Sequence, residues 1–311
     1  MKALQISSYG GNEVAHLSTK APKPELRPGT VLVKVHCAGL NPVDWKIREG
    51  YMKDHVPLDF PATLGSDFSG VIEEIAEDIT GFEIGDEVFG SAIVSLGGSG
   101  AIAEYLVTPA KNILKKPKDI SHKIAAASAT VGVCAHLCLE EYPVDKDSKV
   151  LVLGGSGGIG RAAIQLAKDK GAYVATTTRN KHLEEVKKTG ADKVIDVSAQ
   201  NFQDMLSGYD LVIDPLGDEP YKKSFSVLRK GGIIASVSSH PDETLMQKYE
   251  VDSKFILGFP NQELLEIITR YLQEGILVPK ISKVFSLDEA VEALDYQQNG
   301  RPGGKIIIKI K

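Results

Sequence analysis

The stretch that decides the fold is Val150-Leu-Val-Leu-Gly-Gly-Ser-Gly-Gly-Ile-Gly160. An apolar run typical of a strand leads into a Gly-x-Gly-x-x-Gly pattern, and a helical segment at 158–170 follows it. In such a unit Gly155 would permit the tight turn, Gly157 would let the backbone approach a pyrophosphate, and Gly160 would let the helix pack closely on the strand. The anion then binds free N–H groups at the start of the helix. A glycine-rich turn without a ligand is the alternative. The predicted dinucleotide contacts are Gly155, Ser156, Gly157, Gly158, Ile159 and Gly160.

The end of the next strand indicates which nicotinamide cofactor would bind. NAD sites usually place Asp or Glu about 20 residues beyond the glycines, where the carboxylate accepts a hydrogen bond from the ribose 2′-hydroxyl. Here the segment reads Ala175-Thr-Thr-Thr-Arg-Asn180, with no acid before Glu184. Thr177, Thr178 and Arg179 can instead donate to a 2′-phosphate. We therefore expect NADPH, although a polar strand end with a solvated arginine gives the same pattern.

Strands and helices alternate from about residue 120 onward, which is typical of βαβ units and a doubly wound parallel sheet. Ligands of such sheets bind at the carboxyl ends of the strands, so Leu216 and Ser238, which follow two predicted strands, are expected to contact the cofactor. Strands are predicted at 149–153, 173–177, 193–196, 209–214 and 232–237. Helices are predicted at 122–140, 158–170, 181–189, 200–207 and 219–229.

The first third of the chain is β-rich, with short alternating strands at 31–37, 70–75 and 86–90 separated by glycine and proline turns. This pattern favours an antiparallel, barrel-like domain. A closing strand at 305–309 could rejoin it and make that domain discontinuous. The fold class is therefore α/β, with one domain at 1–120 completed by 262–311, and a dinucleotide-binding domain at 121–261.

Composition and charge exclude several classes of protein. The chain has 311 residues and a formal net charge of −5, which argues against a general nucleic-acid binder. Three cysteines cannot build a disulfide framework and fit a reducing compartment. The N-terminus shows no secretory pattern, and no run reaches the roughly 18 apolar residues of a membrane span, so we expect a cytoplasmic protein without a transmembrane segment.

Three motifs outside the glycine-rich turn resemble a known family. They are Gly39-Leu-Asn-Pro-Val-Asp-Trp-Lys46, Leu64-Gly-Ser-Asp-Phe-Ser-Gly70 and the closing Gly303-Gly-Lys305. Together with the turn, they resemble the medium-chain dehydrogenase/reductase superfamily along nearly the whole chain. Within it the chain is similar to the zinc-independent quinone oxidoreductases and enone (alkenal/one) oxidoreductases. The resemblance implies a GroES-like catalytic domain, a Rossmann domain that binds NADPH, and a homodimer formed through the Rossmann edge.

The positions that hold zinc in related alcohol dehydrogenases carry different residues here. The resemblance aligns those ligand positions with Asn41 and with Ser66-Asp67. Catalytic zinc needs three Cys, His or carboxylate ligands, and only Asp67 is one of these. The structural zinc of the family uses four closely spaced cysteines, and residues 91–110 contain none. Cys134 and Cys138 on the predicted helix at 122–140 fit core packing better than a metal site. We therefore predict no metal.

A reductase without zinc needs an acceptor that is already activated. Without zinc, no Lewis acid polarises the carbonyl group of an isolated ketone. A quinone or α,β-unsaturated carbonyl instead accepts hydride at a conjugated carbon, and the negative charge moves to its oxygen. Hydrogen-bond donors and a proton source then suffice. The resemblance places Lys46 beside the nicotinamide, where it would hold the ribose or the enolate oxygen; a surface lysine is the alternative. Asn41 could bind ribose or substrate, or only cap a helix at Pro42. Tyr51 is a weaker acid candidate, or a pocket-wall aromatic.

The predicted function is an NADPH-dependent reductase of quinones or activated alkenes, acting on small conjugated carbonyl substrates. Two other functions stay open. One is a metal-free alcohol or carbonyl dehydrogenase, and the other is a non-enzymatic protein that binds NADPH.

Overall fold

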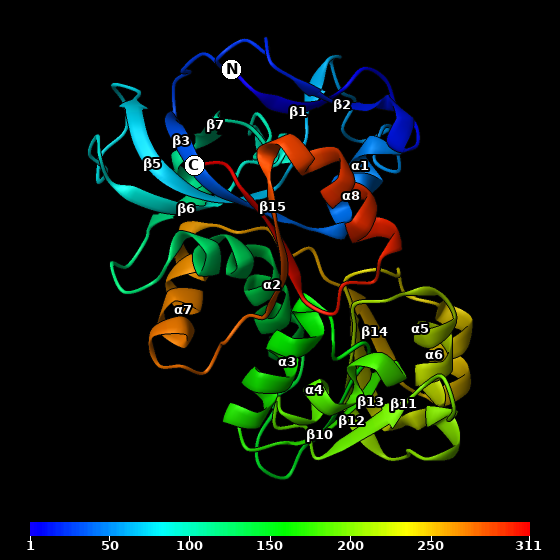
Figure 1. Cartoon of the computed structure of the whole chain (residues 1–311). Helices are drawn as coiled ribbons and strands as arrows, with labels where there is room; N and C mark the ends of the chain where they lie inside the picture. Colours follow the sequence, from blue (N-terminus) through cyan, green and yellow to red (C-terminus); the bar gives the residue numbers. More distant parts are fainter. The chain divides into compact units, whose positions relative to one another are not determined.

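A computed structural model describes all residues 1–311, and the chain divides into two compact units (Figure 1). The first unit consists of Met1–Thr130, Pro260–Gln273 and Lys280–Lys311. The second consists of Val131–Phe259 and Glu274–Pro279. The first unit is therefore discontinuous in sequence, because the second is inserted into it.

The second unit is built on a six-stranded sheet in which every neighbouring pair of strands is parallel. Its strands, in spatial order, are β11 (Lys193–Asp196), β10 (Tyr173–Thr178), β9 (Lys149–Val152), β12 (Tyr209–Asp214), β13 (Leu228–Ser236) and β14 (Asp252–Phe255). In chain order this is 3-2-1-4-5-6, the Rossmann arrangement, and the order reverses between β9 and β12. The predicted doubly wound sheet is confirmed.

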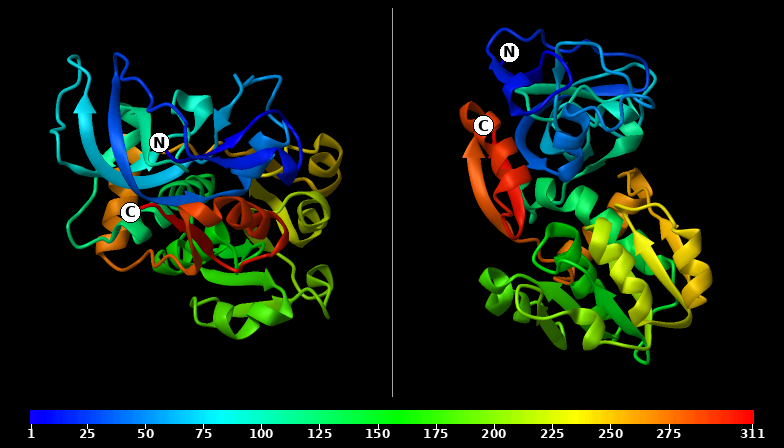
Figure 2. Two further views of the ribbon diagram at one scale, coloured as in Figure 1. Left: turned by 45° about the horizontal axis from the view of Figure 1, so that its top comes forward. Right: turned by 90° about the vertical axis from the view of Figure 1, so that its right-hand side faces the viewer.

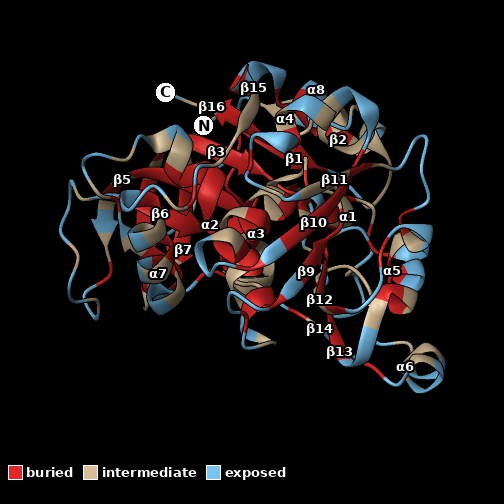
Figure 3. Cartoon of the chain, turned by 90° about the horizontal axis from the view of Figure 1, so that it is seen from below, coloured by how far each residue is buried: buried red, intermediate tan, exposed pale blue.

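Three helices of this unit are shorter than predicted, and a fourth predicted helix does not form. The helices observed are α3 (Gly158–Asp169), α4 (Leu183–Lys187), α5 (Asp218–Ser224) and α6 (Glu243–Tyr249). The predicted helix at 200–207 is wrong: only a 3-10 turn forms, because burial of Phe202 and Leu206 holds a short segment that ends at Gly208, whose φ is +71°. The predicted helix at 219–229 is too long, since Leu228 already belongs to β13. In Figure 3 β9 and β12 are buried, whereas α5 and α6 carry exposed residues.

The strands of the first unit pair in an antiparallel manner, except for β15 with β16. One sheet contains β2 (Ala15–Ser18), β1 (Ala3–Ile6) and β4 (Ala62–Thr63). The other contains β15 (Ile281–Ser286), β16 (Lys305–Lys309), β3 (Thr30–Leu40), β5 (Asp67–Ile75), β6 (Glu87–Ser91) and β8 (Ile113–Lys115), and β7 (Tyr105–Pro109) also pairs with β3. The antiparallel character was predicted, as was the return of the closing strand: β16 lies along β3 (Figure 2).

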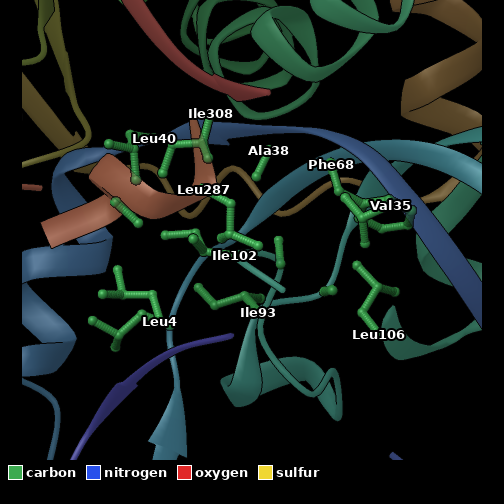
Figure 4. Packing of buried hydrophobic residues seen from close by; sticks show 14 of the residues in the cluster. Leu4, Val35, Ala38, Leu40, Phe68, Ile93, Ile102, Leu106, Leu287 and Ile308 are labelled. Carbon is green, nitrogen blue, oxygen red and sulfur yellow. The ribbon is translucent and has the colours of Figure 1, made fainter. Parts of the chain in front are cut away.

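Apolar side chains from distant parts of the sequence form the core of the first unit. Leu4, Val35, Phe68, Ile102 and Ile308 point into one cluster from five segments (Figure 4). The helices of this unit are α1 (Pro42–Arg48), α7 (Gln262–Gln273) and α8 (Ala290–Asn299). Because Ile308 of β16 belongs to this core, the C-terminal strand is an integral part of the unit.

Helix α2 (His122–Glu140) contributes residues to both units, since the division falls after Thr130. Ala126 and Ala127 pack against Cys37 and Ile307 of the first unit. A side chain at Gly39 of β3 would overlap the Ala126 carbonyl, so glycine permits this close approach. By length and composition α2 could cross a membrane, but 67% of its apolar window is buried inside the structure, as in the core helix of a globular protein.

Candidate active site and cofactor-binding turn

The glycine-rich turn connects β9 to α3 as predicted. Gly157 is the N-cap of α3, and no side chain caps the helix there. The first N–H groups of a helix have no intrahelical partners, so those of α3 are available to an anion. A side chain at Gly160 would overlap the Gly154 carbonyl, and a side chain at Gly157 would touch nothing closer than that same carbonyl at 3.4 Å. Gly160 thus serves the close strand–helix packing, while Gly157 leaves the entrance to the helix uncovered.

The conformational role assigned to Gly155 belongs to its neighbour. Gly154 has a φ of +66°, in the left-handed region that favours glycine, whereas Gly155 has no positive φ. Gly155 is required for space instead, because a side chain there would overlap the hydroxyl of Thr176 on β10. The prediction that Gly155 makes the tight turn is therefore wrong in detail.

Two threonines at the end of β10 have different surroundings. Thr177 Oγ1 accepts a hydrogen bond from the Gly154 N–H at 3.0 Å, so this residue helps to shape the turn. Thr178 Oγ1 is buried and has no hydrogen-bond partner, and Arg179 follows it on the surface. A buried hydroxyl without a partner costs free energy unless a ligand satisfies it. The residues at this strand end therefore fit a ligand that accepts hydrogen bonds, such as the 2′-phosphate of NADPH.

Asp214 organises the ends of β12 and β13. Its carboxylate accepts hydrogen bonds from the N–H groups of Leu216 and Gly217, both at 3.0 Å, and from the Ser236 hydroxyl at 2.7 Å. Burial raises the pKa of Asp214, and these donors act against that rise. Ser238 is positioned by the same hydroxyl, since its N–H donates to Ser236 Oγ at 3.1 Å. Asp214 thus fixes the loops that carry both strand-end residues predicted from the sequence.

Leu216 and Ser238 follow β12 and β13, the two strands whose ends are connected through Asp214. Leu216 is half exposed and approaches Gly154, where a side chain would overlap its methyl groups. The Ser238 hydroxyl donates to the Pro215 carbonyl at 3.1 Å. Ser239 and His240, the next residues, line a pocket of the second unit together with residues at the start of α5. The turn after β9 and the strand ends of β12 and β13 therefore lie together at the reversal point of the sheet.

In the first unit, Asn41 lies within a buried polar network. Asn41 is the N-cap of α1, and its N–H donates to Asp44 Oδ2 at 2.7 Å. Its side-chain amide donates to Ser66 Oγ at 2.9 Å and to Asp67 Oδ2 at 2.8 Å. Both amide hydrogens are thus engaged inside the protein. Asn41 therefore occupies the N-cap position of α1, but its side chain links Ser66 and Asp67 and makes no capping hydrogen bond.

A lysine completes this network. Lys305, the first residue of β16, places its ammonium group 2.6 Å from Asn41 Oδ1, 2.9 Å from the Leu40 carbonyl and 3.4 Å from Asp67 Oδ2. Thr130 donates to the other oxygen of Asp67 at 2.5 Å. An ammonium group that belongs to the chain itself is therefore part of the buried network of Asn41, Ser66 and Asp67.

Asp44 is the second carboxyl group beside this lysine. It is buried, and burial raises its pKa to about 7, with the negative charge of Asp67 acting in the same direction. The hydrogen bond from the Asn41 N–H and the charge of Lys305 oppose this rise. One oxygen, Asp44 Oδ1, is buried without a hydrogen-bond partner. The network therefore contains a carboxyl group whose protonation changes near neutral pH.

Lys46 lies within α1, and Tyr51 follows the end of this helix. Lys46 Nζ is 5.8 Å from the centre of the Trp45 ring, and Lys46 is partly exposed. Tyr51 is 70% exposed and meets the Trp45 ring edge-on at 5.9 Å between centroids. Its N–H donates to the Lys46 carbonyl at 3.0 Å. Lys46, Trp45 and Tyr51 thus form one surface group, next to the buried network but outside it.

All three cysteines are buried, and none of them forms a disulfide. No group of three or more His, Cys, Asp or Glu side chains in the chain has the arrangement of a metal site. Sequence reasoning missed Lys305 and Asp214 as site residues. A signal for Lys305 existed, because it directly precedes the three isoleucines of β16 and is buried with them, whereas Lys309 at the other end of the strand is exposed. Asp214 likewise ends an apolar strand at the edge of the sheet where ligands bind.

Comparison with known proteins identifies the family. Residues 27–118 match the alcohol dehydrogenase GroES-like domain, and residues 189–308 match the zinc-binding dehydrogenase family. A 2-methylene-furan-3-one reductase of Solanum lycopersicum is 33% identical over 99% of this chain and 79% of its own length. An NADPH-dependent alkenal/one oxidoreductase, chloroplastic, of Arabidopsis thaliana is 30% identical over the same shares.

The solved structures agree with the sequence relatives. The quinone oxidoreductase from Coxiella burnetii superposes with a TM-score of 0.93 at 32% identity, covering 100% of this chain and 99% of that one. The similarity therefore extends over both units, including the C-terminal strand that carries Lys305. With this likeness and the relatives above, the chain belongs to the medium-chain dehydrogenase/reductase superfamily, and it groups there with oxidoreductases of quinones and enones.

Proposed function

We propose that this protein is an NADPH-dependent reductase of quinones or α,β-unsaturated carbonyls that transfers hydride without a metal. The observation that carries the proposal is the buried Lys305–Asp67–Asn41 network at the positions of the zinc ligands. A lysine ammonium among these residues disfavours a divalent cation in the same space. The printed names of the relatives support the substrate class.

The residues of the second unit fit NADPH. The uncapped start of α3 suits a pyrophosphate, with Gly155, Ser156, Gly157, Gly158, Ile159 and Gly160 around it. Thr178 Oγ1 has an unmet hydrogen-bonding capacity beside the exposed Arg179, which supports a 2′-phosphate at this strand end. We propose that Thr177 holds the turn and that Leu216 and Ser238 line the nicotinamide end. NADPH when bound supplies the hydride.

The first unit would stabilise the charge that develops on the substrate. When hydride reaches the conjugated carbon, negative charge moves to the carbonyl oxygen, and a nearby ammonium group lowers the energy of that state. We propose Lys46 as this donor, because Lys46 is partly exposed and its ammonium group lies over the Trp45 ring, outside the buried network. Solvent or a pocket donor then supplies the proton.

The other two predicted residues have narrower roles in this proposal. Both amide hydrogens of Asn41 are engaged within the buried network, so Asn41 positions α1 and is not a proton donor. Tyr51 is strongly exposed and packs on Trp45, so it forms part of the surface around Lys46. Its hydroxyl is the weaker candidate for the proton source.

Steady-state reduction of a naphthoquinone, an enone and an alkenal tests the function, with NADPH and NADH compared for each acceptor. We expect turnover with NADPH, and a fall in kcat/KM of about 10²-fold in Lys46→Ala, the usual size for a lost charge-stabilising donor. Lys53→Ala, at an exposed position beyond α1, is the matched control and should retain activity.

Other outcomes would select the alternative functions. Ethanol oxidation that does not depend on added zinc would favour a simple alcohol dehydrogenase. Tight NADPH binding without turnover of any acceptor would favour a non-enzymatic protein. Full activity of Lys46→Ala would remove Lys46 as the donor while leaving the reductase assignment in place.

We also propose a homodimer formed along β14, since this strand ends the sheet of the second unit and has a strand neighbour on only one side. Light scattering of the purified protein measures this directly. Cytoplasmic residence is a prediction from the sequence, whereas several relatives are named chloroplastic or mitochondrial. Localisation of a fluorescent fusion would decide between compartments.

A further inference from the structure

We propose that Lys305 is a positioning residue for this reductase. Its buried ammonium group fixes the turn at Leu40 and Asn41 from which α1 begins, and thereby sets the place of Lys46. This inference rests on the proposed function only for its effect on turnover. The mechanical part, that Lys305 holds α1, stands on the geometry of the first unit alone.

Lys305 lies beside the end of β3 because of strand pairing. Ile306 of β16 is opposite Leu40, the last residue of β3, so the preceding Lys305 reaches just past the end of that strand. Its ammonium group meets the Leu40 carbonyl at 2.9 Å and Asn41 Oδ1 at 2.6 Å. The C-terminal strand therefore binds, through Lys305, the two residues that precede Pro42, the first residue of α1.

The same ammonium group ties this turn to two other elements. Asp67, the first residue of β5, is fully buried and lies 3.4 Å from Lys305 Nζ through Oδ2. Asn41 donates to that same oxygen, and Thr130 of α2 donates to Oδ1 of Asp67. Four segments thus converge on one ion pair, and Lys305 is its only cation.

The hydrogen bonds of Lys305 explain why it positions and does not itself react. A lysine ammonium has three N–H donors and no acceptor. Leu40 O, Asn41 Oδ1 and Asp67 Oδ2 supply three acceptors, and Lys305 is only 4% exposed. No donor is left for a substrate oxygen. The accessible ammonium group of this region is that of Lys46, whose helix Lys305 holds.

Helix α1 is short and is held at both ends. At its C-terminal end the buried Arg48 donates to the Gly10 carbonyl at 3.2 Å, to Asn12 Oδ1 at 3.0 Å and to Gln298 Oε1 at 2.8 Å. Lys305 and Asn41 hold the N-terminal end. Lys46 stands between these two attachments. Loss of the attachment at the N-terminal end would allow the first turn of α1 to move. A displacement of about 1 Å in a reacting group such as Lys46 can lower the rate about 10²-fold.

The test compares Lys305→Met with Lys116→Met. Lys116 is a close control, because it is also buried in the first unit, at 8% exposure. It too has three acceptors, the carbonyls of Pro117 and Ile120 at 2.9 and 2.6 Å and Glu87 Oε2 at 2.9 Å. None of these residues belongs to α1. Both variants lose one buried cation, but only the first should release the helix.

We expect kcat/KM for the acceptor to fall about 10²-fold in Lys305→Met, with the dissociation constant of NADPH unchanged in a fluorescence titration. Backbone hydrogen exchange of residues 42–48 should become faster in this variant. Lys116→Met should keep wild-type values in all three measurements. Propylammonium added to Lys305→Ala should restore activity, because it replaces the missing carbons and charge.

A second variant distinguishes a loss of positioning from a loss of folding. Lys305→Met leaves Asp67 as a buried carboxylate without its cation, which is strongly destabilising. The double variant Lys305→Met/Asp67→Asn removes both charges, and the new amide can still accept from Thr130. It should fold, exchange rapidly at residues 42–48 and remain slow in turnover.

The outcomes separate this inference from the proposed function. If wild type reduces no acceptor, the proposed function fails, and hydrogen exchange alone then decides whether Lys305 holds α1. If wild type is active but Lys305→Met and the double variant match Lys116→Met in turnover and exchange, Lys305 has no positioning role. Faster exchange with unchanged kcat/KM would also overturn the proposal, because α1 would then move without consequence for Lys46.

Discussion

The Thr178 hydroxyl at the end of β10 is buried and has no hydrogen-bond partner. Its removal should therefore stabilise the free protein but weaken the binding of NADPH. Thr178→Val removes an unsatisfied polar group, so the free energy of unfolding of the free protein should rise by up to about 1 kcal/mol. The same change removes a donor to the 2′-phosphate and should weaken NADPH, but not NADH, severalfold. Thermal denaturation and binding titrations of the two cofactors measure both effects.

Thr176→Val is the matched control on the same strand. The Thr176 hydroxyl donates to the Val152 carbonyl at 2.8 Å, so the substitution removes a buried hydrogen bond. This variant should lose about 1 kcal/mol of stability. If Thr178→Val were destabilised to the same degree, or if both cofactors weakened equally, the hydroxyl of Thr178 would not be kept for the 2′-phosphate.

Single residues were also where sequence reasoning reached its limit. The Gly-x-Gly-x-x-Gly spacing located the turn correctly, yet it could not show that Gly154 has the positive φ and Gly155 only the close neighbour. Lys305 is 264 positions from Asn41 in sequence, and only the pairing of β16 with β3 brings them together. A contact of this kind depends on the register of two strands, which no local pattern specifies.

At the scale of elements, the start of α2 forms a pH-sensitive contact with the sheet of the first unit. His122 Nδ1 is 2.8 Å from Ser69 Oγ, its Nε2 is 3.2 Å from Glu87 Oε1, and its ring lies 4.2 Å from that of His36 between centroids. Lys116 pairs with the same glutamate. Burial lowers the pKa of both histidines, and the charge of Glu87 acts against this.

The sign of the pH dependence follows from these lowered pKa values. The unfolded histidines take up protons near pH 6.5, before the folded ones, so stability is complete above that pH and is lost as the pH falls below it. His122→Gln keeps a hydrogen-bonding side chain that does not titrate. The free energy of unfolding should therefore decline less between pH 7.5 and 5.5 in this variant, by at most about 1.4 kcal/mol per pH unit.

Urea denaturation at several pH values measures this slope. Asp44, whose raised pKa makes stability fall as the pH rises toward 7, contributes equally to both proteins and cancels in the comparison. His16→Gln, at an exposed position of β2, is the control and should retain the wild-type slope. A variant slope equal to that of wild type would contradict the assignment of this pH dependence to His122.

The predictability of individual elements depended on how they are stabilised. Strands β9, β12 and β16 each contain three consecutive apolar residues, and the sequence located each strand within a residue or two. The segment at 200–207 has apolar residues at helical spacing, yet tertiary burial of Phe202 and Leu206 holds it as a turn. Helix α6 was missed because it is only seven residues long and none of its residues is fully buried, although Leu245, Met246 and Tyr249 stand at helical spacing and pack against the core.

At the scale of the whole molecule, the two units differ in how far apart in the sequence their neighbouring elements are. The second unit is a local succession of βαβ pieces, so a doubly wound parallel sheet could be predicted from alternation and the glycine-rich turn, whereas its strand order and its sixth strand, β14, were not predicted. The first unit joins segments from both ends of the chain, and its boundary lies inside α2. Its network of Lys305, Asp67 and Asn41 exists only because the C-terminal strand returns to β3.

The central claim is that hydride reaches a conjugated carbon with no metal in the site, and a deuterium-transfer measurement tests it most directly. The protein, dialysed against a chelator, is given an enone and NADPH deuterated at the transferred position, and the product is examined by NMR. We predict deuterium at the β-carbon of a saturated ketone, at a rate unaffected by the chelator. Deuterium on the carbinol carbon of an allylic alcohol, or activity that returns only with zinc, would contradict the claim.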